Sequence, residues 1–549
     1  MLSEKYKKVF SLTGLSYLTI FCVGFLLYFK TLFYELVYLD DNVLIVNYHW
    51  FFKNLANSKE FFFHPGYISK MFYRPLLNIS FMLDTQWGDV LWPYHFTNIG
   101  IHVLNGCLLF ALLKKLDYAK GLSLSFALIF TVHPVFTQAV AWIPGRTDSL
   151  LAVFVLSSFI CFLNFLAKEK YVYFLCHLLF FVCALLTKET AIVIPVLCAL
   201  SLWLIKRTKI TSKASWIMLL SWVATTGLWW IARSHVLKAS TDLSLLTAVH
   251  SLARNLPAII PYFGKIILPM NLSVLPVLVD MRFTYGYVSL LMVIILFVFS
   301  KSPRWHYCLW GGCWFLLFLL PSLVISFLKH EYRLYLPMIG VIILLLETGP
   351  VRSLAEHPKR ATTVLVIILT VFAIITFQYS DQFKDRFTFW HSAVKTSPHS
   401  PLAHRNLGAM YHLNGEIDKA ETSYRRSFAL DPREPMVQNN LGLIYAKRGL
   451  LKQAEDAYKG EIAVNPLYSN VHFNLGILYY NQGEIEQAVE LWERTLELDP
   501  QYIEAYKYLA VHSFDTGNSQ KTSYYVDQLK TRGIPVSKEI IKELEVLNR

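Results

Sequence analysis

Charged side chains are scarce in this sequence of 549 residues. They make up 16% of it, whereas hydrophobic residues make up 55% and aromatic residues 15%. Soluble globular chains usually carry about 25% charged residues. The composition therefore excludes a disordered, a collagen-like or a purely soluble protein.

Cysteines are few and give no pattern. All eight fall within apolar runs: Cys22, Cys107, Cys161, Cys176, Cys183, Cys198, Cys308 and Cys313. They have neither the arrangement of a secreted disulfide framework nor the spacing of metal ligands. We predict no disulfide framework and no protein-ligated metal site.

The formal net charge of +13 is unevenly spread. Residues 1–397 carry 34 basic and 18 acidic side chains, and residues 398–549 carry 17 and 20. The basic excess lies in the apolar part, where lysines and arginines commonly flank membrane spans. Nucleic-acid binding would need a basic soluble face, and the polar C-terminal part is slightly acidic.

Long apolar runs dominate the first two thirds of the chain. Each is about the length that crosses a bilayer as a helix. We count eleven candidate spans: 9–29, 96–113, 121–143, 149–167, 171–187, 190–205, 214–232, 284–300, 306–328, 334–350 and 361–379. The apolar stretch 255–279 contains four prolines, so we interpret it as interfacial or re-entrant.

The basic residues of the connecting loops predict an orientation. Seventeen lysines and arginines fall in loops on the same side as the N-terminus, including Arg207 and Lys209, and only four acids oppose them. The positive-inside rule then places the N-terminus in the cytoplasm. An odd number of spans places everything after about residue 380 on the opposite side of the membrane.

The C-terminal part repeats with a period of 34 residues. Asn-Leu-Gly recurs at 406–408, 440–442 and 474–476, and glycines, alanines and prolines keep the same step. This is the tetratricopeptide (TPR) pattern of paired antiparallel helices. Four such units predict a curved solenoid whose concave face binds a polypeptide, with a plain spacer as the alternative.

Ionisable residues gather on one predicted face of the membrane part, the outer one. The first outer loop, 30–95, contains Asp40-Asp41 and Tyr73-Arg74-Pro75, and later outer turns contain 133–148, Lys188-Glu189 and 330–337. Ionisable groups near a membrane are costly, ~2.5–3.5 kcal/mol each at the centre of a span, so they indicate a functional site.

A lipid-linked sugar phosphate would suit this constellation. Its tail stays in the bilayer while arginine and lysine hold its phosphate and stabilise the charge on the leaving group. A nearby carboxylate can take the proton from an acceptor hydroxyl. Each piece also has an ordinary structural explanation, such as a helix cap, a headgroup anchor or an ion pair. A transporter or a non-catalytic scaffold therefore stays open.

The order of these motifs resembles a known family. It runs Asp-Asp after the first span, Tyr-Arg-Pro-Leu, His-Pro-Val-x-Thr-x-Ala-Val-Ala-Trp-Ile-x-Gly-Arg-x-Asp, Lys-Glu, Glu-x-Arg-Leu-Tyr-Leu-Pro, and then TPRs. In nearly its whole length the chain resembles the transmembrane and TPR-repeat O-mannosyltransferases and their bacterial relatives. These are C-type (GT-C) glycosyltransferases.

The resemblance implies a fold and an activity. The fold is all-α: a polytopic GT-C-like membrane domain of about eleven spans over 1–380, a linker at 381–397, and a TPR solenoid of four repeats at 398–549. The activity is inverting transfer of a sugar, mannose first, from a dolichyl- or undecaprenyl-phosphate carrier to a hydroxyl outside the cytoplasm, with protein Ser/Thr as the expected acceptor. The donor is then a co-substrate, no further cofactor is required, and a role for a divalent metal stays open.

The resemblance also assigns residues. It implies Asp40 as the general base, with Asp41 positioning it or the acceptor. Residues implied to bind the carrier phosphate or the sugar, or to shape their site, are Arg74, His133, Arg146, Lys188, Glu189, Glu331 and Arg333.

Two departures from the family bear on these assignments. The arginine before Leu-Tyr-Leu-Pro comes one place later than in eukaryotic members, and Gln138 stands where Glu is common. With the short repeat array, they favour a bacterial chain in the inner membrane, although an endoplasmic reticulum membrane would give the same topology.

Three other functions stay open from the sequence. They are a transferase acting on lipid or surface glycan, a membrane-anchored TPR scaffold without catalysis, and a lipid-linked glycan ligase or polymerase. The outer Asp-Asp motif argues against the ligase or polymerase. The sequence does not identify the sugar or the acceptor.

Overall fold

The protein is helical wherever its structure is described. The computed structural model describes residues 2–65, 72–206, 213–237, 245–324 and 330–536, and these contain helices, turns and loops without a β-strand. They fall into two compact units, residues 1–397 and 398–549, each of which is described by itself. The predicted all-α class is confirmed.

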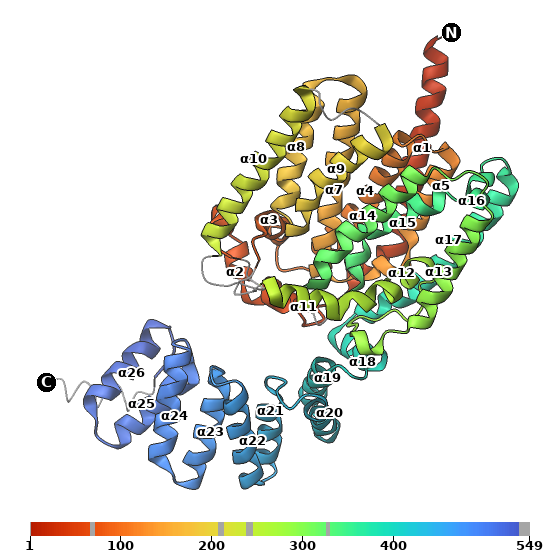
Figure 1. Cartoon of the computed structure of the whole chain (residues 1–549). Coiled ribbons are helices and arrows are strands. Elements are labelled where there is room, and N and C mark those ends of the chain that lie inside the picture. The colour runs from red at the N-terminus through yellow and green to blue at the C-terminus, as the bar shows by residue number, and fades with distance from the viewer. Residues whose placement is uncertain (1, 66–71, 207–212, 238–244, 325–329, 537–549) are drawn as a thin grey trace. The chain divides into compact units, whose positions relative to one another are not determined.

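The first unit is a bundle of helices that differ in length (Figure 1). Its α-helices are α1 (Leu2–Tyr28), α2 (His49–Phe52), α3 (Pro75–Thr85), α4 (Trp92–Lys115), α5 (Lys120–Val132), α6 (Thr137–Ala141), α7 (Arg146–Lys168), α8 (Tyr171–Leu185), α9 (Ile194–Ser201), α10 (Lys213–Val236), α11 (Leu245–Asn255), α12 (Ile259–Ile267), α13 (Phe283–Val298), α14 (Trp305–Val324), α15 (Pro337–Leu346), α16 (Gly349–Ser353), α17 (Pro358–Ser380) and α18 (Arg386–Thr396).

Every predicted span overlaps at least one of these helices, and residues 325–328 of the span 306–328 lie outside the described residues. By length and composition, five of the described helices could cross a membrane, or six if one bent pair counts as a single span. Four further apolar helices are shorter: Tyr171–Leu185, Glu189–Ile205, Phe283–Val298 and Pro337–Leu346. This makes the first unit a multi-pass membrane unit, and eleven crossings stay a prediction.

The predicted span 121–143 is broken. Helix α5 ends at Val132, and the chain bends by 47° before the next helical turn. Pro134 is the cause, because it lacks an N–H and keeps the preceding His133 in an extended conformation. Residues 133–145 consequently fold as the short turns η4 (Pro134–Phe136), α6 and η5 (Ile143–Gly145).

The segment 381–397, expected to be a linker, is part of the first unit. It forms the turn η11 (Asp381–Phe383) and helix α18. Phe383, Phe389 and Trp390 have no exposed surface. The apolar run stops at residue 380 and therefore predicted a boundary that is too early, because one face of α18, with Phe389 and Trp390, is buried in the first unit.

Loops at the end of the unit remote from Asp40 are joined by one buried carboxylate. The Tyr118 hydroxyl donates to Glu347 Oε1 at 2.7 Å, and Arg304 donates to the same oxygen at 2.6 Å through Nη2. Three loops predicted to be cytoplasmic thus contact one another. Arg207 and Lys209, which the orientation argument also used, lie outside the described residues.

The second unit contains four antiparallel helix pairs. They are α19 (Pro401–Leu413) with α20 (Ile417–Leu430), α21 (Val437–Lys447) with α22 (Leu451–Val464), α23 (Ser469–Gln482) with α24 (Ile485–Leu498), and α25 (Ile503–Asp515) with α26 (Ser519–Thr531). Within a pair the helices approach closely: a Cβ at Gly442 would lie 2.5 Å from the Tyr458 ring. Four TPR repeats are confirmed. Residues 537–549 of the predicted repeat domain lie outside the described residues.

Candidate active site

The two acids of the first outer loop have different surroundings. Asp41 is 1% exposed, and its carboxylate accepts N–H bonds from Val37 at 2.6 Å and from Leu39 and Asn42 at 3.1 Å. Burial raises the pKa of Asp41, and these backbone bonds oppose the rise. Asp41 therefore fixes the shape of the loop.

Asp40 keeps its carboxylate available. The residue is half-buried, and its carboxylate has no hydrogen bond or ion pair with any residue that the structure describes. Burial, and then the charge of Asp41, raises the pKa of Asp40 to about 6. A carboxylate with this pKa and no partner can accept a proton near neutral pH.

The first loop is held by the segment 381–397. The Glu35 N–H donates to the Lys384 carbonyl at 2.8 Å, and the Trp390 indole N–H donates to the Val37 carbonyl at 3.0 Å. Lys30 forms an ion pair with Asp381 at 2.7 Å. Residues at the two ends of the first unit thus fix the loop that carries Asp40.

Arg74, later in the same outer loop, forms an ion pair with Glu189. Arg74 Nε and Nη2 donate to Glu189 Oε2 at 3.2 and 2.9 Å, while the Tyr73 N–H reaches Oε1 at 3.4 Å. Burial raises the pKa of Glu189, but the charge and hydrogen bonds of Arg74 outweigh it and leave that pKa lowered. Arg74 Nη1 has no hydrogen bond among the described residues.

Lys188, the residue before Glu189, pairs with an acid from the start of α7. Its Nζ lies 2.6 Å from Asp148 Oδ2, and both side chains are about nine-tenths buried. Burial lowers the pKa of Lys188, Asp148 opposes this, and the positive charge of Arg74 adds to it. The Arg74–Glu189 and Lys188–Asp148 ion pairs therefore influence each other electrostatically.

Tyr332 lies where these charges meet. Burial raises the pKa of its hydroxyl, Asp148 and Asp40 raise it further, and Arg333 and Arg74 lower it. We call the group of Asp40, Arg74, Asp148, Lys188, Glu189, Tyr332 and Arg333 the charged cluster. Its members come from five segments that lie far apart in the sequence, and they are linked by the ion pairs and electrostatic interactions given above.

Aromatic rings border the charged cluster. The His330 ring stacks on Tyr332 with centroids 5.0 Å apart, and Trp142 lies 5.9 Å from His330 and 6.1 Å from Tyr332. Among the described residues, the buried Trp142 indole N–H has no partner. Arg333, which follows Tyr332 in the chain, donates from Nη1 to the Ser322 carbonyl at 3.2 Å. This hydrogen bond orients its side chain.

Arg146 lies apart from the charged cluster. Its side chain is completely buried, lies 2.6 Å from Asp84, and donates to Asn98 at 2.7 Å and to the Tyr94 carbonyl at 2.8 Å. The predicted role in binding the carrier is not what this geometry supports. Arg146 instead ties α3 and α4 to the start of α7, as an internal ion pair.

His133 and Glu331 also have internal partners. His133 Nδ1 accepts the Val135 N–H at 3.2 Å, and its Nε2 donates to the Ile266 carbonyl at 3.0 Å. Glu331 is fully buried and pairs with Lys265 at 2.6 Å. Both residues frame the site, since they hold the turns that precede Trp142 and Tyr332.

Gln138 explains one departure from the family pattern. Its amide nitrogen donates to the Val274 carbonyl at 3.0 Å, and its amide oxygen accepts the Glu331 N–H at 3.1 Å. A carboxylate could not donate to Val274. The amide therefore links three segments around the site.

Sequence reasoning missed Asp148, Tyr332, His330 and Trp142 as parts of the site. The available signal was their position, because each belongs to one of the outer motifs. In the described residues there is no group of three or more His, Cys, Asp or Glu side chains arranged to hold a metal ion.

Comparisons with known proteins agree with this two-part architecture. Tetratricopeptide repeat models match residues 413–468 and 469–502. The protein O-mannosyl-transferase tmtc2 of Xenopus laevis is 29% identical over 187 residues, which cover 31% of this chain and 22% of that one. Protein O-mannosyl-transferase F38B6.6 of Caenorhabditis elegans is 24% identical over 379 residues, 65% of this chain and 54% of that one.

Human protein O-mannosyl-transferase TMTC2 is 30% identical over 161 residues, 27% of this chain and 18% of that one. These alignments span from about a fifth to about half of the relatives' own lengths. The chain is a multi-pass helical membrane protein with a TPR unit. It is related to the transmembrane and TPR-repeat (TMTC) protein O-mannosyltransferases, as its motifs indicate.

Proposed function

We propose that this protein is a glycosyltransferase that moves a sugar from a polyprenyl-phosphate donor to a hydroxyl on the outer side of the membrane. Mannose is the expected sugar, and a serine or threonine of a polypeptide is the expected acceptor. The observation that carries the proposal is the Asp40 carboxylate, which has no partner among the described residues and acts on the pKa of Tyr332 together with the cations of Arg74 and Arg333.

The cations suit the donor phosphate. Arg74 keeps Nη1 for a new hydrogen bond, and Lys188 and Arg333 add positive charge to the same site. Charge-assisted hydrogen bonds from arginine and lysine to phosphate are among the strongest in proteins. They would stabilise the negative charge that grows on the phosphate oxygen as it leaves.

Asp40 suits the acceptor. The acceptor oxygen attacks the anomeric carbon, the bond from that carbon to the phosphate oxygen breaks, and the electron pair leaves with the phosphate. Asp40 takes the hydroxyl proton as the new bond forms. One displacement with one base inverts the anomeric configuration. These groups supply the charge stabilisation without a metal, so we propose that no cofactor beyond the donor is needed.

The aromatic border and the TPR unit suit the two remaining tasks. The aromatic rings of Trp142, His330 and Tyr332 pack on one another and give the site a rigid border, and the TPR unit offers a binding surface to a polypeptide acceptor. We propose that the chain is a multi-pass membrane protein, and that the charged cluster and the TPR unit both lie outside the cytoplasm. A bacterial inner membrane or the endoplasmic reticulum meets that description.

A defined assay tests the proposal. The purified full-length protein is incubated with radiolabelled mannosyl-phosphoryl-polyprenol and exported peptides, and product is measured in the peptide and lipid fractions. Label on serine or threonine supports the proposal. Label only in a lipid or surface glycan moves the acceptor to that class, and no transfer with any lipid-linked sugar would refute it.

A further inference from the structure

An apolar cleft lies between α8 and α10, which run side by side in Figure 1. Its volume is about 250 Å³, and its lining residues are Val182, Leu185, Leu186, Thr225, Leu228, Trp229 and Ala232. Leu228 is 70% exposed, so the cleft opens to the side of the bundle. Almost all of this lining is hydrocarbon.

Two donors at one end of the cleft lack partners. Trp229 is 7% exposed, and its indole N–H has no hydrogen-bond acceptor among the described residues. The same holds for Nε of Arg233, one turn further along α10. The Arg233 guanidinium lies 6.0 Å from the Trp229 ring and 5.5 Å from the Trp230 ring. Buried donors without acceptors are costly, and they indicate a ligand that accepts hydrogen bonds.

The cleft is continuous in sequence and contact with the charged cluster. Leu186 lines the cleft, and its carbonyl accepts the N–H of Leu76, two residues after Arg74. Lys188 and Glu189 come two and three residues after Leu186. A ligand between α8 and α10 would thus border the segment that carries Lys188 and Glu189.

We infer that the cleft between α8 and α10 holds the isoprenoid chain of the donor nearest its phosphate, and that Arg233 and the Trp229 indole bind that phosphate in addition to the cations of the charged cluster. Charge and shape both favour this occupant: an apolar slot open to the side, ended by a cation and an unpartnered N–H. The inference rests on the proposed function, because it identifies the lipid carrier of the same site.

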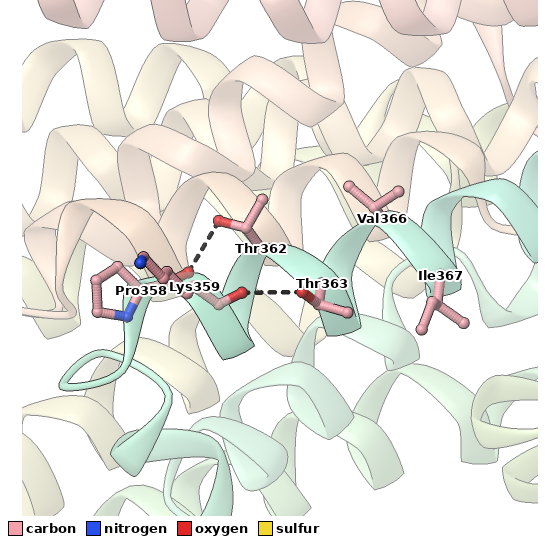
Figure 2. A pocket seen from close by; sticks show the side chains of 6 residues that line it. All are labelled: Pro358, Lys359, Thr362, Thr363, Val366 and Ile367. Atoms are coloured by element: carbon pink, nitrogen blue, oxygen red, sulfur yellow. Dashed lines mark hydrogen bonds between the residues drawn. The ribbon is translucent and has the colours of Figure 1, made fainter.

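A second surface depression offers the contrast. It lies along α17 and is lined by Pro358, Lys359, Thr362, Thr363, Val366 and Ile367. Figure 2 shows that the Thr362 and Thr363 hydroxyls already donate to carbonyls of their own helix. It has a cation beside apolar residues but no unpartnered buried donor, so Lys359 provides a matched control.

The test is equilibrium binding by the purified full-length protein in nanodiscs. The probes are undecaprenyl phosphate and the neutral undecaprenol, and the variants are Arg233→Gln, Trp229→Phe, Ala232→Phe and Lys359→Gln. Loss of one charge-assisted contact should weaken phosphate binding about tenfold in Arg233→Gln and leave undecaprenol binding unchanged. Trp229→Phe should act in the same direction to a smaller extent.

Ala232→Phe places a ring in the cleft from an exposed position, so it should weaken both lipids, and Lys359→Gln should weaken neither. Unchanged phosphate binding in Arg233→Gln overturns the inference. So does an equal loss of both lipids in that variant, which would make Arg233 and its tryptophans a simple headgroup anchor.

The two proposals fail separately. If the wild type shows this binding pattern and transfers no sugar, the lipid site stands and the glycosyltransferase proposal fails. If the wild type transfers sugar while Arg233→Gln binds the phosphate normally, only the lipid site fails.

Discussion

Asp41 places its carboxylate 2.6 Å from the Val37 nitrogen, inside the loop that it shapes, whereas the neighbouring Asp40 leaves its own carboxylate without a partner in the described structure. The sequence presents the two acids as a pair. The structure separates them into one residue that holds the backbone and one residue that can exchange a proton.

Replacing Asp40 by asparagine keeps the shape of the side chain and removes the base. We expect transfer to fall by ~10²–10⁴-fold, the usual contribution of a general base. Turnover with the labelled donor measures this. Asp89→Asn is the control, because Asp89 belongs to the same outer loop but is exposed and pairs with His49 and Lys53. Full activity of Asp40→Asn would eliminate Asp40 as the base.

The pKa of Asp40 predicts a pH profile. Since the base must be ionised and its pKa is raised to about 6, turnover should be constant above that pH and fall on acidification through it. The decline should approach tenfold per pH unit. A profile of kcat at saturating donor checks this. A profile that stays flat down to pH 5 contradicts the assignment.

Arg74→Lys tests the phosphate contact. Lysine keeps the charge but cannot reproduce the planar fork that holds Glu189 and leaves Nη1 available. We expect the KM for the lipid donor to rise about tenfold, with a smaller change for the acceptor. Arg352→Lys, on an exposed arginine near Glu347, is the matched substitution and should leave both constants unchanged.

Glu331→Gln should affect stability before chemistry. It removes the charge that pairs with Lys265, whose side chain is 4% exposed, and leaves that ammonium buried and uncompensated. Such a loss destabilises a protein by ~3–5 kcal/mol. Thermal unfolding in detergent should show a clear drop in Tm. A variant with unchanged Tm and lost turnover would instead place Glu331 in the chemistry.

Gly442→Val tests the packing of the repeats. The added methyl groups would enter the Tyr458 ring, because even a Cβ would lie 2.5 Å from it. Overpacking of this kind costs ~1–3 kcal/mol. Circular dichroism during heating should show earlier unfolding of the TPR unit. Gln453→Ala, on the exposed face of α22, should leave that transition in place.

Periodicity and motif spacing predicted the large features. The 34-residue step at Gly408, Gly442 and Gly476 predicted the first three helix pairs, since each glycine meets an aromatic ring of its partner helix. The apolar runs located the helices of the first unit. Such signals survive in a sequence because they repeat or are long.

Local exceptions to hydropathy could not be predicted in the same way. Pro134 ends a span that composition alone continues to residue 143, and α18 is buried by aromatic contacts although the run of apolar residues stops at 380. Both depend on tertiary packing, which the local composition does not record.

The sequence predicted which residues to consider for the candidate site better than it predicted the role of each residue. Asp40, Arg74, Lys188, Glu189 and Arg333 were named from their motifs, and their charges act on one another's pKa or on that of Tyr332, while their common role in one site stays a prediction. Arg146 was named for the same reason, yet its guanidinium contacts Asp84, Asn98 and the Tyr94 carbonyl inside the protein. A motif records that a residue matters and does not separate a ligand contact from an internal one.

The hydrogen bonds that join Trp390 and Lys384 to the first loop determine where the protein can be truncated. A truncation at residue 380, where the apolar sequence stops, would remove both the repeats and the helix that secures Val37 and Glu35. A loss of activity in that truncation could then be attributed wrongly to the missing repeats rather than to the missing support of the first loop. A truncation after Ser397 keeps α18 in place, and it is the cut that tests the catalysis proposed for the first unit separately from the acceptor binding proposed for the repeats.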